Sequence, residues 1–104
     1  MDEIFKALAD RNRRKMLDRL RREAGLTLSE LVDDIEMTRQ SASRHVSVLE
    51  AAGLVVTHWS GREKLHYLNP VPVVEISERW LDKFSQDKAL ALLALKSALE
   101  DHEK

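Results

Sequence analysis

The sequence contains no cysteine and few residues that interrupt regular structure. Its 104 residues include 3 glycines and 2 prolines, and aromatic side chains make up only 5% of the chain. Without cysteine there can be no disulfide bond, thiolate metal ligand or cysteine nucleophile. No apolar run approaches the ~18 residues of a membrane-spanning helix, and the first residues are acidic rather than basic and then apolar. We therefore expect one soluble cytoplasmic domain without a signal peptide.

The patterns that mark catalytic sites are also missing. No nucleophile–base pair, glycine-rich phosphate loop or convergent set of carboxylates can be identified, and the three glycines all fall between predicted elements. We therefore expect neither an enzyme nor a bound cofactor.

The charge is nearly balanced but unevenly distributed. The net charge of −1 counts against nucleic-acid binding, since most such domains carry a basic excess. However, basic residues dominate positions 1–22, and positions 38–49 contain two arginines and no acid. Acidic residues gather at 30–36 and in the last third of the chain. A chain of this kind can present one basic surface despite its neutral total.

The most informative stretch runs from Thr38 to Leu49, where polarity divides cleanly around a predicted helix that Thr38 caps. One side of this helix is apolar, with Ala42, Val46 and Leu49. The opposite side is polar, with Gln40, Arg44 and Ser47 flanked by Ser41 and Ser43. Arginine and glutamine suit base edges and phosphates, and serine lets a helix approach DNA closely. Taken alone, the stretch fits a DNA-reading helix and an ordinary solvated surface equally well.

Two helices are predicted before this stretch. The first is short and runs to about Ala9, with apolar residues at Ile4, Phe5 and Leu8. The second runs from Arg11 to about Arg22 behind an Asp10 cap. Its inner stripe consists of the aliphatic stem of Arg13 followed by Met16, Leu17 and Leu20. We interpret most of its many arginines as solvated, because only one side of one helix could reach DNA.

A third helix is predicted after Gly25. Thr27 and Glu30 form the pattern of a capping box, and Leu28, Leu31, Val32 and Ile35 share an apolar face. Only residues 36–38 separate this helix from the polar one at 39. Residues 27–53 therefore predict a helix-turn-helix, which Gly53 would end.

The sequence then changes to the pattern of a β-hairpin. Residues 54–59 and 64–68 are rich in β-branched and aromatic side chains and flank a turn at 60–63. A hairpin at 54–69 after a recognition helix forms a wing, whose Arg62 and Lys64 could reach a phosphate or the minor groove. A mixed-charge tip can also simply be soluble. His58 and His66 could face each other across the hairpin, although we favour a surface pair over a zinc site.

The C-terminal third carries more apolar residues than a small domain can bury. After Pro70 and Pro72, an apolar stripe is predicted at Val73, Ile76, Trp80, Leu81 and Phe84. The pattern weakens at 85–87, and residues 89–95 are then all apolar, which covers a helix on every side. This surplus predicts a second subunit.

In the order of these segments the chain resembles the ArsR/SmtB family of winged-helix repressors over nearly its full length. Residues 4–14 (IFKALADRNRR) are similar to the family's "LADPTRRRIL" opening, and residues 41–49 (SASRHVSVL) to its "STVSRHLKVL". Residues 50–55 and the Gly61–Arg62 turn continue the match. The resemblance implies a mainly α fold with a small β-hairpin, a winged helix-turn-helix extended by dimerisation helices at 1–9 and 71–104. It also implies a homodimeric repressor that places two recognition helices in successive major grooves of an inverted-repeat operator.

Together these arguments give two sets of candidate site residues. The DNA-binding set is Arg39, Gln40, Ser41, Ser43, Arg44, His45, Ser47, Arg62 and Lys64. Within it, the angular position of His45 favours a flanking role, either packing on a neighbouring helix or making one phosphate contact. The dimer-interface set is Ile4, Phe5, Leu8, Trp80, Phe84, Leu92, Leu95 and Leu99.

The chain departs from the metal-sensing members of the family. Those members carry a cysteine pair in the third helix, near residues 31–33 here, or Asp, His and Glu ligands on the last helix. This sequence has no cysteine, and on the last helix Asp101 and His102 are adjacent with no second histidine. We therefore expect no metal site.

Two other functions remain open from sequence. A winged helix can act as a protein-interaction module without DNA binding, which the near-zero net charge favours. A regulator could also sense a small ligand in a pocket between its dimerising helices.

Overall fold

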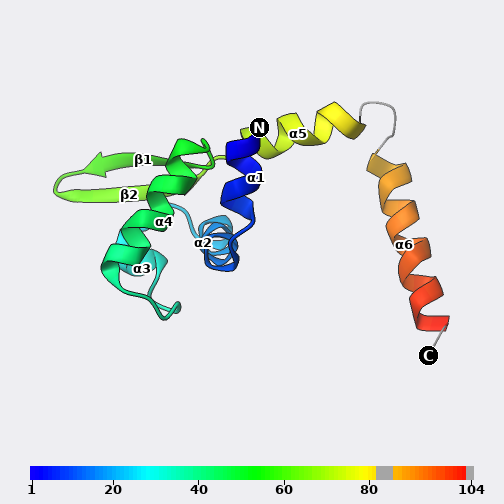
Figure 1. Ribbon diagram of the computed structural model, residues 1–104, viewed down its shortest axis with the longest axis horizontal. Helices are drawn as coiled ribbons and strands as arrows, with labels where there is room; N and C mark the ends of the chain where they lie inside the picture. Colours follow the sequence, from blue (N-terminus) through cyan, green and yellow to red (C-terminus); the bar gives the residue numbers. More distant parts are fainter. Residues whose placement is uncertain (82–85, 103–104) are drawn as a thin grey trace. The chain divides into compact units, whose positions relative to one another are not determined.

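The computed structural model describes residues 1–81 and 86–102 of the chain. The elements are α1 (Asp2–Leu8), α2 (Arg11–Arg22), α3 (Leu28–Leu31), α4 (Arg39–Ala51), β1 (Val55–Ser60), β2 (Glu63–Leu68), α5 (Val71–Leu81) and α6 (Gln86–His102) (Figure 1). The chain forms two compact units, Met1–Pro72 and Val73–Lys104. The predicted fold class is confirmed: the described chain is mainly helical, with one antiparallel hairpin.

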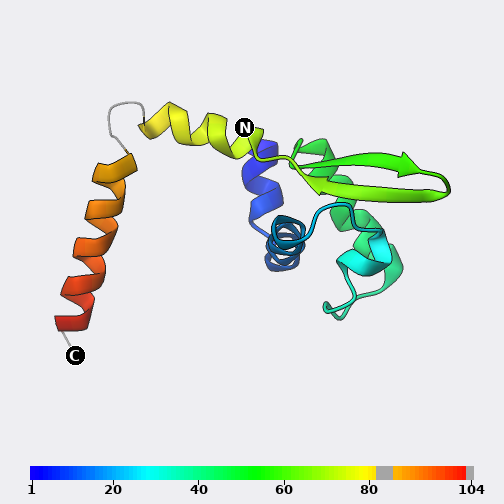
Figure 2. The ribbon, with the colours of Figure 1, turned by 180° about the vertical axis from the view of Figure 1, so that it is seen from behind.

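The first unit is built around α4. Helices α1, α2 and α3 and strand β1 all contact it, and Figure 2 shows this arrangement from behind. The core between these elements contains Ala7, Met16, Leu20, Leu31, Val46, Leu49, Leu54 and Val55, all at most 5% exposed. Because α4 turns its apolar side to this core, its opposite side faces solvent.

Helix α2 begins and ends where the sequence predicts. The Asp10 carboxylate accepts a hydrogen bond from the backbone N–H of Arg13 at 3.1 Å, and the helix runs to Arg22. The sequence predicted that only the aliphatic stem of Arg13 would pack, and this prediction was incomplete. Its guanidinium group is also engaged, and the side chain is only 15% exposed. Carbonyls in the last turn of α1 provide the acceptors, and sequence periodicity does not report this contact.

Helix α3 is shorter than predicted. Its capping box is confirmed, but the helix ends at Leu31, and Val32 leaves helical geometry at φ −114° and ψ 14°. The prediction extended it through Ile35 because Val32 and Ile35 continue an apolar face, and both do pack against the core. Acidic Asp33 and Asp34 would lie at the negative end of the helix dipole and disfavour another turn. Val32 and Ile35 therefore make their apolar contacts from a turn rather than from a helix.

Helix α4 is defined at both ends. Thr38 Oγ1 accepts a hydrogen bond from the Ser41 N–H at 3.0 Å. At the other end, the Gly53 N–H bonds the carbonyl of Glu50 at 2.9 Å and the Leu54 N–H bonds that of Leu49 at 3.0 Å. This is the Schellman pattern, and it requires the positive φ of +75° that Gly53 adopts. The buried Leu49–Leu54 pair then leads directly into β1.

The hairpin is tighter than predicted, with Gly61 and Arg62 alone between the paired strands. Gly61 has φ +62°, as the first central position of a two-residue hairpin turn often requires. In the strand register Thr57 lies opposite His66, and Leu65 lies opposite His58. His58 and His66 therefore point to opposite faces, because side chains alternate along a strand, and the expectation that they could face each other was wrong.

The base of the hairpin is tied to the segment before α3. Leu26 pairs with His66 in an isolated antiparallel bridge, with the His66 N–H bonding the Leu26 carbonyl at 2.8 Å. The His66 ring, only 3% exposed, has Nδ1 2.8 Å from the same carbonyl oxygen. This buried histidine is a structural residue that fixes the wing to the start of the helix-turn-helix.

The second unit consists of helical segments with little burial of their own. α5 ends at Leu81 and α6 begins at Gln86, and no residue of α5 is buried. The leucines of α6 at positions 90, 92, 93, 95 and 99 are between 56% and 63% exposed. Phe84, one of the predicted interface residues, lies outside the described residues. Within the described part of the chain, no helix is long and apolar enough to cross a membrane.

Candidate nucleic-acid interface

The solvent side of α4 presents the predicted polar residues. Arg39, Gln40, Ser43, Arg44 and Ser47 are exposed, whereas Ser41 and His45 are half-buried. Thr38 and Ser41 are joined at the cap, so the Ser41 N–H is already satisfied. The spacing of the exposed set follows from the burial of Ala42, Val46 and Leu49 on the other side.

The side chains on this surface differ in whether they already form hydrogen bonds or ion pairs within the protein. Ser47 Oγ donates to the Ser43 carbonyl at 3.0 Å, which leaves the hydroxyl only its acceptor capacity. In residues 1–81 and 86–102, no hydrogen bond or ion pair engages the side chains of Arg39, Gln40 or Arg44. These three carry the available donors, and Arg44 is best placed near the middle of the helix.

An open groove of about 440 Å³ runs between α4, the start of α3 and the inner face of the hairpin. It brings together five predicted residues from two separate segments, namely Arg39, Ser43, Ser47, Arg62 and Lys64. Gln40, Ser41, Arg44 and His45 do not line it. The wing and the recognition helix therefore share one concave surface.

Sequence reasoning did not assign every groove residue to the site, and Ser29 and Trp59 are two that it missed. Ser29, exposed at the start of α3, and Trp59, 62% exposed on β1, both line the groove. Strand alternation places Trp59 on the same face as its cross-strand neighbour Lys64, and this signal was present in the sequence. Ser29 had no such signal, because only the packing of α3 on α4 brings it to this surface.

Lys64 is partly neutralised within the protein. Its Nζ lies 3.6 Å from Glu50 Oε1 on the recognition helix. This pair joins the wing to α4 and reduces the positive charge that Lys64 can offer a phosphate. In the described residues, no hydrogen bond or ion pair engages Arg62, which is the stronger candidate of the two.

Several arginines of α2 form hydrogen bonds or ion pairs within the protein. Arg14 donates to the Leu8 carbonyl at 2.7 Å. Arg19 forms ion pairs with Glu23 at 3.6 Å and with Asp33 at 3.7 Å. Arg11, Arg21 and Arg22 are exposed, and the interpretation that most of the arginines of α2 are solvated stays a prediction.

Two carboxylates are held in their charged form by helix caps. The Arg13 backbone N–H is the largest cause of a lowered pKa at Asp10, assisted by the charge of Arg13. The Thr27 backbone N–H and hydroxyl lower the pKa of Glu30 in the capping box. Both carboxylates stabilise helix starts, one in α2 and one in the helix-turn-helix.

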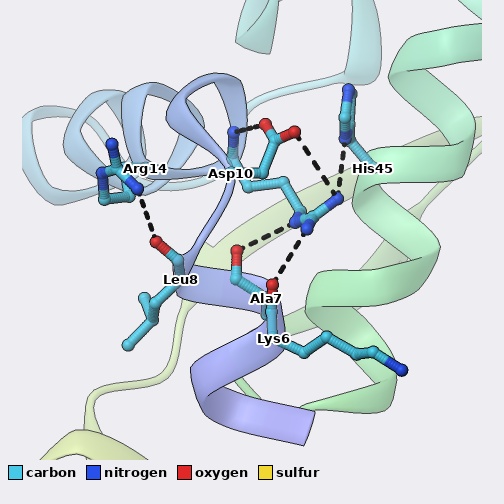
Figure 3. A network of polar contacts seen from close by, with 7 residues as sticks. Lys6, Ala7, Leu8, Asp10, Arg14 and His45 are labelled. Carbon is cyan, nitrogen blue, oxygen red and sulfur yellow. Dashed lines mark hydrogen bonds and ion pairs between the residues drawn. The ribbon is translucent and has the colours of Figure 1, made fainter.

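His45 contacts a neighbouring helix. Arg13 Nη1 lies 3.2 Å from His45 Nδ1, and Figure 3 labels His45 together with Lys6 and Ala7, whose carbonyls accept from the same guanidinium group. Arg13 Nε donates to the Ala7 carbonyl at 2.8 Å and Nη2 to the Lys6 carbonyl at 2.9 Å. Of the two flanking roles expected for His45, the structure supports contact with the neighbouring helix.

Among the described residues, no group of three or more His, Asp or Glu side chains is arranged to hold a metal ion. The buried His66 uses Nδ1 in a backbone contact, and His58 points to the other face of the hairpin.

Comparisons with known proteins agree with this geometry. A helix-turn-helix domain family matches residues 8–58. The HTH-type transcriptional regulator YuzN of Bacillus subtilis is 39% identical over 87 residues, which cover 78% of this chain and 95% of YuzN. The crystal structure of the ArsR family transcriptional regulator RHA00566 superposes with a TM-score of 0.68 at 34% identity, covering 86% of this chain and 89% of that one. This chain belongs to the ArsR family.

Two further relatives bear on how such a fold is used. The transcriptional repressor SdpR of Bacillus subtilis is 30% identical over 84 residues, covering 81% of this chain and 91% of SdpR. The homodimeric winged helix-turn-helix domain of Mb0332 from Mycobacterium bovis superposes with a TM-score of 0.66 at 21% identity, covering 99% of this chain and 84% of that one. This ArsR-family chain is thus a winged helix-turn-helix transcriptional regulator that binds DNA, and not an enzyme.

Proposed function

We propose that this ArsR-family chain is a cytoplasmic homodimeric repressor that reads an inverted-repeat operator with two α4 helices, without a metal effector. The observation that carries the proposal is the exposed polar side of α4 beside the groove it shares with the wing. Its guanidinium and amide groups are uncommitted donors on a helix whose other side is fixed in a core. Such donors pair with guanine and adenine in the major groove.

Specific residues take different roles in this proposal. Arg44 and Gln40 read base edges, while Arg39, Ser43 and Ser47 contact bases or backbone from the groove. Ser41 contacts DNA from the capped first turn of α4. Arg62 reaches a phosphate or the minor groove from the wing, and Lys64 assists weakly because Glu50 neutralises part of its charge.

The dimer follows from apolar surface that one chain leaves exposed. Phe5 on α1, Trp80 on α5 and the leucines of α6 are all more than 40% exposed. Ile4 and Leu8 are half-buried and also pack against the core of their own chain, so they would form the base of the interface. The homodimeric state of the Mb0332 domain supports the same assembly here. A twofold dimer would place two recognition helices about one turn of DNA, 10–10.5 base pairs, apart.

Repression is the simplest outcome of this geometry. A dimer that covers two successive major grooves at a promoter excludes other proteins from the same DNA. The similarity to the repressor SdpR supports this direction of control.

The test begins with the DNA that the purified protein selects from genomic fragments. Arg44→Ala is then titrated against the selected fragment, with Arg79→Ala on α5 as a matched arginine control. We expect Arg44→Ala to lose about 1–3 kcal/mol of specific binding, as for a bidentate arginine–base contact. Unchanged operator affinity and salt dependence in Arg44→Ala would show that α4 does not read DNA. Footprinting should reveal two half-sites, and a single half-site would contradict the dimer.

A further inference from the structure

The side chain of Arg13 joins three helices of the first unit. It starts on α2, caps the end of α1 and meets the recognition helix α4 at His45 (Figure 3). We infer that Arg13 is a positioning residue for DNA recognition, which sets the rotation of α4 by holding His45, and that His45 serves as its acceptor rather than as a DNA contact. This inference rests on the proposed function, since it assigns a role within DNA recognition.

The guanidinium group is fixed before it reaches His45. Two of its nitrogens donate to the carbonyls of Ala7 and Lys6, at 2.8 and 2.9 Å, in the last turn of α1. Among the described residues, the Lys6 carbonyl otherwise accepts only a long bond from the Ala9 N–H at 3.4 Å, so Arg13 acts as a side-chain cap for α1. Asp10 Oδ2 lies 4.0 Å from Nη1 and adds a weaker attraction. Because the group is planar, these contacts determine where the Nη1 donors point.

Nη1 of the guanidinium group lies 3.2 Å from His45 Nδ1. Because arginine has only donors, His45 Nδ1 acts as the acceptor in this contact. A hydrogen bond of this kind is lost when the atoms separate beyond about 3.5 Å. The pair therefore tolerates little movement of α4 relative to α1 and α2.

Sequence position makes this contact relevant to DNA reading. His45 directly follows Arg44, so rotating α4 to redirect Arg44 would also move the ring away from Arg13. Successive residues on a helix differ by about 100°, and the two side chains therefore leave α4 in different directions, one to solvent and one to α2. Burial agrees with this division, since Arg44 is exposed and His45 is half-buried.

The test uses full-length protein, the genomic DNA fragment it selects and a scrambled fragment of equal length. His45→Ala removes the acceptor, and we expect its preference for the selected fragment to fall about tenfold, the effect of losing one charge-assisted hydrogen bond. His45→Asn keeps an acceptor oxygen near the position of Nδ1, and we expect the preference to stay within about twofold of the original protein. His58→Ala, an exposed histidine on the hairpin, is the matched control.

Each outcome decides the inference. Rescue by His45→Asn, with non-specific affinity unchanged, supports a positioning role. If His45→Asn binds as poorly as His45→Ala, then His45 acts on DNA through Nε2 and the inference is overturned; an unaffected His45→Ala overturns it as well. Should His45→Ala fold poorly in urea titrations, His45→Leu supplies the same loss of acceptor with more apolar volume. Failure of the proposed function appears separately, as Arg44→Ala with unchanged affinity.

Discussion

The two units of this chain use leucine in opposite ways. In Met1–Pro72 the leucines at 20, 26, 31, 49 and 54 are at most 2% exposed, whereas those on α6 at 90, 92, 93, 95 and 99 are all above 50%. The first unit closes a core of its own around α4. The second presents apolar surface that the described chain does not cover. Under the proposed function, this difference predicts that the DNA-reading surface is built within one chain and that the second unit depends on association.

The core of the first unit should be the most sensitive part of the molecule. Leu49→Ala removes a side chain with 0% exposure beneath the recognition helix. We expect the free energy of unfolding to fall by about 2–5 kcal/mol, because a cavity adds to the lost burial. Urea denaturation followed by circular dichroism measures the change, and Leu90→Ala on α6 is the control. Equal losses of unfolding free energy in both variants would contradict the difference between the two units.

The apolar surface of α6 should matter for assembly rather than for the fold of the first unit. Leu92, Leu95 and Leu99 recur at intervals of three and four residues and so share one face of the helix. We expect Leu95→Glu to weaken the dimer by about 2–3 kcal/mol, since a charge replaces a side chain buried by the partner. Sedimentation equilibrium gives the dimer constant, and Leu90→Glu tests the opposite side. A dimer unaffected by Leu95→Glu would exclude this face from the interface.

The smallest expected effect is at the Asp10 cap, which stabilises the first unit alone. Asp10→Ala should cost about 1 kcal/mol of unfolding free energy through the lost cap. The pKa of Asp10 is lowered on folding, so the charge stabilises the folded state above the ordinary value of 3.8 and ceases to do so as pH falls through the folded pKa.

Asp10→Asn separates the charge from the hydrogen bond. Asparagine still accepts a hydrogen bond from the Arg13 N–H. We therefore expect the unfolding free energy of Asp10→Asn to be lower than that of the original protein near neutral pH and equal to it in acid. Urea titrations across pH 2–7 would measure the gap. A difference in unfolding free energy that increases as the pH falls would contradict the lowered pKa of Asp10.

Much of the first unit could be predicted from sequence because its signals are local. The caps at Asp10, Thr27 and Thr38 and the glycine at 53 each determine a helix end through neighbouring backbone groups. The apolar spacing in α4 likewise fixed which side would be exposed. α3 was predicted too long because Val32 and Ile35 contact the core from a turn, and periodicity cannot distinguish a turn from a helix there.

The candidate site was only partly predictable. The polar residues of α4 follow from helical spacing, but the groove depends on how the hairpin folds back over α4. Ser29 and Trp59 join the groove only through that packing. The mistaken pairing of His58 with His66 has the same origin, since a shift of one residue in strand register exchanges the two faces.

By itself, the sequence determined the order of elements, the capped starts of α2, α3 and α4, the polar side of α4 and the apolar surplus near the C-terminus. These depend on contacts within a few residues or on simple periodicity. Only the tertiary structure decided that Arg13 spans three helices, that His66 is buried against Leu26 and that Glu50 pairs with Lys64. Such contacts join positions 14 to 40 residues apart, and their geometry is set by packing of the whole unit rather than by any local pattern.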